Sequence, residues 1–82
     1  MLKMKIECYI QEKPFKSEAL NLMVTANLTV IYGDADDVTL VVRHVPVAQG
    51  RNENHIVSKS VISLAQWESM KSVILGDSKK IS

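Results

Sequence analysis

The chain has 82 residues, of which 46% are hydrophobic and 23% charged, and its formal net charge is +1. A chain of this length makes one domain with a thin core, so residues 1–82 are expected to fold as a single unit. The small net charge excludes a strong general attraction to nucleic acid, membranes or acidic substrates. Any charged surface must therefore be local.

Several features favour a reducing compartment. The single cysteine, Cys8, cannot close an intramolecular disulfide or complete a cysteine-rich zinc site. Charges at Lys3, Lys5 and Glu7 interrupt the apolar run that a signal peptide needs, and no stretch reaches the ~18 apolar residues of a membrane span. The sequence therefore predicts a cytoplasmic protein without a membrane partner.

The first strand is predicted from strict alternation at the start of the chain. One face carries Leu2, Met4, Ile6, Cys8 and Ile10, and the other carries Lys3, Lys5, Glu7, Tyr9 and Gln11. The polar stretch from Glu12 to Glu18 contains Pro14, which cannot donate to a sheet ladder, so it is expected to connect two strands.

Three further strands follow from alternation and turn residues. A long strand is predicted from Leu20 to Tyr32, a hairpin loop at Gly33–Asp37, and a return strand from Val38 to about Val45. After a polar loop at Gln49–Asn54, a weaker fourth strand covers about Ile56 to Ile62.

The last predicted element is a helix from about Ser63 to Leu75. Ser63 is expected to cap it, Gln66 to complete a capping box, and Gly76 to end it. The tail, residues 77–82, is expected to fray. The apolar face expected to lie against the apolar faces of the first three strands comprises Leu64, Trp67, Met70, Val73 and Ile74. The fold class is therefore α+β, a four-stranded antiparallel meander followed by one C-terminal helix (β-β-β-β-α).

The residues offer little for catalysis. His44 and His55 lack the spacing of a zinc site, and the aspartates near residue 34 lack the glycine and glutamate of a calcium loop. Cys8 lies on an apolar strand face, where burial makes a thiol inert. No phosphate loop or nucleophile elbow is present. The sequence therefore predicts no catalytic, cofactor or metal residues, and a protein that is not an enzyme.

One segment resembles a known family. The run Ser63-Leu-Ala-Gln-Trp-Glu-Ser-Met-Lys71 is similar to the cap-x-x-Gln-Trp-x-x-Leu-Lys segment of the positive-cofactor-four (Whirly-like) transcriptional coactivators. The resemblance implies four antiparallel strands before one helix, a homodimer, and curved sheets that hold single-stranded DNA. The family's Gly-Arg-Lys-Gly stretch falls at Ile56 to Lys59, where only Lys59 is charged.

The leading functional hypothesis is a homodimer that binds single-stranded nucleic acid on the solvent face of its sheet. The expected contacts are phosphate binding by lysine and arginine and base stacking by tyrosine, from Lys3, Lys5, Tyr9, Arg43 and Lys59. The parity of the strands predicts that these residues share one side of the sheet.

Two other classes stay open. The alternative is a non-enzymatic protein-interaction module, a viral or accessory adaptor or inhibitor of a larger machine. A structural subunit of an assembly is the third. A homodimer is expected because one helix cannot cover the apolar length of the strand from Leu20 to Tyr32.

Overall fold

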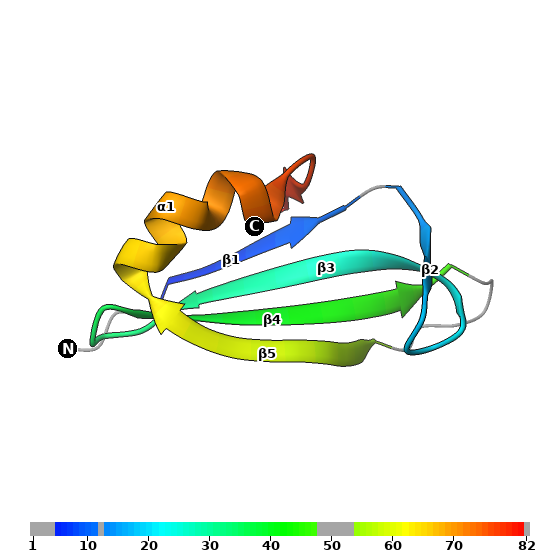
Figure 1. Ribbon diagram of the computed structural model, residues 1–82, viewed down its shortest axis with the longest axis horizontal. Coiled ribbons are helices and arrows are strands. Elements are labelled where there is room, and N and C mark those ends of the chain that lie inside the picture. Colours follow the sequence, from blue (N-terminus) through cyan, green and yellow to red (C-terminus); the bar gives the residue numbers. More distant parts are fainter. Residues whose placement is uncertain (1–4, 12, 48–53, 82) are drawn as a thin grey trace.

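The computed structural model describes residues 5–11, 13–47 and 54–81, and within them the protein is an antiparallel sheet with one C-terminal helix, an α+β fold. The elements in chain order are β1 (Lys5–Ile10), β2 (Phe15–Ser17), β3 (Leu22–Tyr32), β4 (Asp37–Pro46), β5 (His55–Ser63), α1 (Leu64–Leu75) and β6 (Lys79–Lys80). Figure 1 shows α1 leaving the end of β5 and running beside one end of the long strands.

The sheet has six strands among the described residues, so the prediction of four is wrong in its count. The strand order is β5-β4-β3-β1-β6, with β2 paired to β3 beside β1. β1, β3, β4 and β5 are the predicted four, in the predicted meander order. β2 lies in the stretch expected to be only a connection, and β6 in the tail expected to fray. The candidate loop at Gln49–Asn54 falls almost wholly outside the described residues.

β3 and β4 form the centre of the sheet, and their register runs from Val24 opposite Pro46 to Tyr32 opposite Val38. The predicted hairpin loop joins them. Its backbone closes where the Gly33 N–H donates to the Asp37 carbonyl at 2.9 Å, and Asp36 adopts φ 58°, the left-handed conformation that aspartate tolerates in turns.

The ends of α1 are confirmed as predicted. The Ser63 hydroxyl accepts from the Gln66 backbone N–H at 3.1 Å, and the Gln66 side chain accepts from the Ser63 N–H at 3.2 Å, which completes the capping box. Gly76, at φ 52°, ends the helix, and its N–H donates to the Ser72 carbonyl. With twelve residues, α1 is too short to cross a membrane, and no other helix occurs among the described residues.

The core lies between α1 and the middle of the sheet. Trp67 is fully buried against the buried side chains of Val30, Val38 and Leu40. Partly buried apolar residues pack around this group: Tyr9, Leu28, Tyr32, Ile62, Leu64 and Leu75.

The expected packing face of α1 is correct only in part. Trp67 and Leu64 pack on the sheet, but Met70, Val73 and Ile74 have exposed fractions of 46%, 83% and 38%. Met70 and Val73 are exposed to solvent, whereas Ile74 lies where the coverage of the sheet by α1 ends, beside Leu28 and Val42. Helical spacing predicts which residues share one side of the helix, but not the line along which that side meets the strands.

The expected packing face of β1 is wrong. Glu7 lies opposite Val30, and Tyr9 lies opposite Leu28, so both share the face that α1 covers. The apolar alternation of Ile6, Cys8 and Ile10 therefore lies on the other side of the sheet. Two tyrosines and two lysines compensate the carboxylate of Glu7 on the covered side, as described below.

Candidate interaction surface

The strand register assigns each residue to one of two faces, because directly opposed residues of neighbouring strands point the same way. The helix-covered face carries Val30, Val38 and Leu40 beneath Trp67. The open face carries the intervening positions of β1, β3, β4 and β5. Since no described helix packs on the open face, it is the broadest surface that these elements offer to a partner.

Three cross-strand rows make up the middle of the open face, and we call them the central rows. They run from β1 to β5 as Ile6–Ile31–Thr39–Val61, Cys8–Thr29–Val41–Lys59 and Ile10–Asn27–Arg43–Ile56. Seven of these twelve side chains are apolar or thiol, three are uncharged and polar, and two are cationic. The central rows therefore combine apolar surface with positive charge and contain no carboxylate.

The two cations lie close together in these rows. Lys59 is opposite Val41 on β4, and Arg43 is two positions further along the same strand. The Arg43 guanidinium donates to the Thr29 hydroxyl at 2.9 Å, so its stem passes Val41, which is buried although it lies on the open face. Arg43 is thus fixed in place, whereas Lys59 is exposed and forms no ion pair with a described residue.

Large apolar side chains on the open face remain accessible. Ile6 on β1 is 51% exposed, and on β5 Ile56 and Val61 are 59% and 61% exposed. They lie at the two lateral ends of the central rows; on β5, Lys59 lies between Val61 and Ile56, and Arg43 lies opposite Ile56 on β4. Apolar groups around a few charged ones are the usual composition of a protein-binding surface.

The residues expected to bind nucleic acid do not share one face, which corrects the parity prediction. Arg43 and Lys59 are on the open face, but Lys5 and Tyr9 are on the helix-covered face. Lys3 lies outside the described residues. Within each strand, the assignment of alternate residues to opposite faces was correct. That alternation cannot show which face of β1 lies on the same side of the sheet as a given face of β4, because this depends on the register through β3.

Lys5 and Tyr9 instead belong to a polar cluster around Glu7. The Tyr32 hydroxyl donates to Glu7 Oε1 at 2.8 Å, and the Tyr9 hydroxyl donates to the same oxygen at 3.1 Å. Lys80 Nζ on β6 is 3.1 Å from Glu7 Oε2, and Lys5 Nζ is 3.4 Å from it. The Trp67 indole N–H donates to the Tyr32 hydroxyl at 2.9 Å. The cluster therefore joins β1, β3, β6 and α1.

These contacts set the ionisation of Glu7. Burial alone would raise its pKa, but hydrogen bonds from Tyr32, Lys80 and Tyr9 outweigh that effect and lower the pKa from 4.5 to about 2. Burial, together with the nearby Glu7 carboxylate, raises the pKa of Tyr9 and of Tyr32. Glu7 is therefore an anion and both tyrosines are neutral donors near neutral pH.

The sequence reasoning did not find this cluster, although part of the signal was present. Glu7 and Tyr9 are two residues apart on one strand face, and Trp67 on a packing face needs an acceptor for its N–H. The contact with Lys80 spans 73 positions and depends on β6, so no local pattern indicates it.

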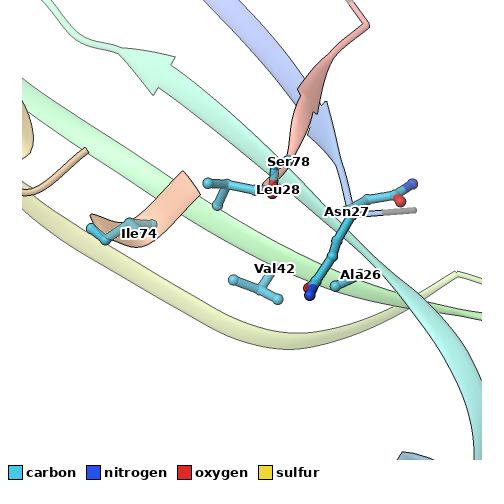
Figure 2. Close-up of a pocket in the computed structure, with 7 residues that line it drawn as sticks. Ala26, Asn27, Leu28, Val42, Ile74 and Ser78 are labelled. Atoms are coloured by element: carbon cyan, nitrogen blue, oxygen red, sulfur yellow. The ribbon is translucent and has the colours of Figure 1, made fainter. Parts of the chain in front are cut away.

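A small cavity of about 160 Å³ lies where α1 ends over the sheet. Figure 2 shows Ile74 of α1 near Val42 and Leu28 of the sheet, with Ser78 beside them. Ligand pockets usually measure 300 to 1,000 Å³, so this cavity has room for a few waters only. We interpret it as the limit of helix coverage rather than as a ligand site.

A second hollow, of about 410 Å³, lies at the first turn of α1 and is lined by Asp36, Ser63, Leu64, Ala65 and Glu68. A helix N-terminus attracts anions, but here the capping box already satisfies the N–H groups of Ser63 and Gln66, and two carboxylates line the hollow. An anionic ligand would meet repulsion at this place.

A polar pair, His44 and Ser17, lies at the other end of the long strands. His44 Nδ1 lies 3.0 Å from the Ser17 hydroxyl, and Phe15 contacts the His44 ring edge to face at 5.1 Å between centroids. Ser17 is only 1% exposed, so a substrate cannot reach its hydroxyl. Within the described residues, no group of three or more His, Cys, Asp or Glu side chains is placed to hold a metal ion.

No family model, curated protein or solved structure matches the chain. Its function must therefore be inferred from the geometry of the open face and of the Glu7 cluster.

Proposed function

We propose that the chain is a non-enzymatic protein-interaction module that binds a partner protein through the open face of its sheet. The observation that carries this proposal is the composition of the central rows, which join exposed Ile6, Ile56 and Val61 to the cations Arg43 and Lys59. The partner surface that fits them is apolar and carries carboxylates, because the central rows contain no acid of their own.

A surface that is already ordered suits this role. β3 pairs with strands on both of its edges, and Arg43 is held by Thr29, so little ordering is needed when a partner binds. Interfaces that are already ordered lose less conformational entropy on association. Adaptors and inhibitors of larger machines act by occupying a surface, which requires no catalytic group.

Photo-cross-linking tests which surface contacts the partner. A photo-reactive amino acid replaces Thr39 on the open face or, as a control, the exposed Ser72 on α1. The proteins that become cross-linked in source cells are then identified. We expect a partner with an acidic surface from Thr39 and not from Ser72. Cross-links from Ser72 alone would contradict the open-face assignment.

Charge reversal then measures the interaction with the purified partner. Arg43→Glu is expected to weaken binding at least about tenfold, since it replaces an attraction with a repulsion. Lys13→Glu makes the same change in net charge at an exposed residue outside the central rows, and it is expected to have little effect. Equal losses in the two variants would show that only overall charge matters.

A second candidate is single-stranded nucleic acid, which Arg43 and Lys59 favour because they lie together on one face. It is weaker, because Tyr9 and Tyr32 lie on the other face and the central rows offer no aromatic ring for stacking. Fluorescence polarisation of labelled oligo-dT distinguishes the two candidates. Two phosphate contacts would give a slope of about −1.4 when the logarithm of the binding constant is plotted against the logarithm of the salt concentration. The first candidate predicts no binding of oligo-dT.

We also propose that the chain forms a homodimer. Exposed apolar side chains on the helix itself support this part, because Met70 and Val73 on α1 are 46% and 83% exposed. Sedimentation that gives only the 9.2 kDa monomer at high micromolar concentration would contradict it.

A further inference from the structure

β5 is a terminal strand of the sheet. Its inner edge pairs with β4 from His55 to Ser63, while no described strand pairs with its outer edge. At the opposite side of the sheet, β6 pairs with part of β1. An unpaired strand edge presents N–H and C=O groups that can pair with another extended chain.

The middle of β5 is accessible from both sides. Ser58, Lys59, Ser60 and Val61 are all exposed, although alternate residues of a strand point to opposite faces. α1 therefore does not cover this stretch, and a neighbouring strand could approach its outer edge without displacing the helix.

The sequence of β5 reads the same in both directions. The run Ile56-Val-Ser-Lys59-Ser-Val-Ile62 is a palindrome centred on Lys59. When two copies of a strand pair antiparallel about a two-fold axis, the residue n places before the axis meets the residue n places after it in the other copy. A palindrome thus pairs each residue with its own type.

We propose that the outer edge of β5 pairs with β5 of a second copy about a two-fold axis at Lys59, which joins the two sheets into one. Ser58 would face Ser60 of the second copy, and Val57 would face Val61. Valine pairs and serine pairs across antiparallel strands are favourable. The register of β5 with β4 shifts between Val42 and Arg43, so that strand is irregular at Val57. We therefore limit the proposed pairing of the two copies to residues 57–61.

The axis places Lys59 beside Lys59 of the second copy, which opposes pairing at low salt. Arg43 lies nearby on the same face in each copy, so four cations surround the axis. Salt screens this repulsion, and an acidic partner across the axis would neutralise it. Neutralisation by an acidic partner rests on the proposed function, whereas the strand pairing itself does not.

A disulfide tests the register directly. Cys8→Ser removes the native thiol, and Lys59→Cys then places one cysteine at the axis. Directly opposed residues of antiparallel strands have Cα atoms about 4.5–5.5 Å apart, within the range that a disulfide needs. We expect a disulfide-linked dimer after mild oxidation with oxidised glutathione.

Ile56→Cys in the same Cys8→Ser background is the matched control. Ile56 is exposed on the same strand but lies three residues from the axis, so its two copies would be about 20 Å apart. Equal cross-linking at both positions, or none at Lys59→Cys when the protein is folded by circular dichroism, would overturn the proposed pairing.

Sedimentation equilibrium provides an independent test without cysteine. Raising NaCl from 50 to 500 mM is expected to tighten the native dimer several-fold, while Lys59→Thr is expected to tighten it at 50 mM and remove the salt effect. A native dimer that weakens with salt, or a Lys59→Thr variant that stays monomeric, would contradict the inference.

Ile6→Asp separates this inference from the proposed function. Ile6 is on the open face of β1, three strands away from β5, so its substitution is expected to reduce partner binding and to leave cross-linking at Lys59→Cys intact. Loss of partner binding with an intact cross-link supports both proposals. Intact partner binding without a cross-link at Lys59→Cys would contradict the strand pairing alone.

Discussion

The carboxylate of Glu7 is a case in which one residue decides how several elements meet. It accepts from Tyr9 and Tyr32 and contacts Lys80, while Tyr32 also accepts from Trp67. A buried carboxylate without these partners would destabilise the sheet. The helix-covered face of β1 can therefore be polar, because its one acid is fully compensated.

The lowered pKa of Glu7 predicts how stability depends on pH. Because the folded pKa of about 2 is below the ordinary value of 4.5, the contribution of Glu7 is present above about pH 4.5 and is lost as the pH falls toward 2. We expect Glu7→Gln to lower the free energy of unfolding at pH 7 on the order of 2 kcal/mol, after allowance for solvent screening.

Urea denaturation of Glu7→Gln at pH 7, 4 and 2.5 measures this contribution. The difference from the native protein is expected to narrow as the pH falls. Glu68→Gln is the control, because its exposed pair with Lys71 is expected to change the free energy by less than about 0.5 kcal/mol. A difference that stays constant with pH would exclude Glu7 as its source.

The side-chain directions within each strand were predictable at this scale, but the covered face of β1 was not. Period-two alternation placed Ile6, Cys8 and Ile10 together, as found. Hydrophobicity then favoured the wrong face, because Glu7 and Tyr9 are polar in sequence and become satisfied only through Tyr32 and Lys80. Contacts distant in the sequence decided the outcome.

Among the elements, α1 shows which features of a helix can be predicted from neighbouring residues in the sequence. Its caps at Ser63 and Gly76 were predictable, since capping depends on residues within one turn. Its packing line was not, because the position of a helix on a twisted sheet depends on the strands below it. Only Trp67 is buried among the residues of this helix.

Two alanine substitutions in α1 are expected to differ sharply. Trp67→Ala removes a side chain with 0% exposure and should cost roughly 3–5 kcal/mol of unfolding free energy, through lost transfer energy and a cavity. Met70→Ala, at a residue 46% exposed, should cost under about 1 kcal/mol. Chemical denaturation of both variants checks this, and similar costs would mean that Met70 is buried in solution.

For the whole molecule, the sequence predicted the order of the long strands but missed β2 and β6. Strands of three and two residues show no measurable periodicity, and each forms only because a longer strand offers an edge. The central rows were beyond prediction for a similar reason, since they depend on three successive registers through β3 and β4.

The strand order also predicts which parts of the molecule open most readily. β3 pairs on both edges, whereas β6 has two residues on the outside of β1. We expect the amides of Leu28, Val30 and Leu40 to exchange slowest with solvent and that of Ile81, bonded to the Cys8 carbonyl at 2.8 Å, to exchange far faster. Exchange followed by NMR checks this, and equal protection would disprove the ranking.

The pairing of β6 with β1 has a consequence for synthesis on the ribosome. Glu7 and Lys80 are 73 positions apart, so at about 5–20 residues per second the lysine is made roughly 4–15 s after the glutamate. β3, β4, β5 and α1 have all been translated before this contact can form. In nascent chains that stop before residue 80, Glu7 lacks its contact with Lys80, so we expect aborted products to be degraded more readily than finished ones.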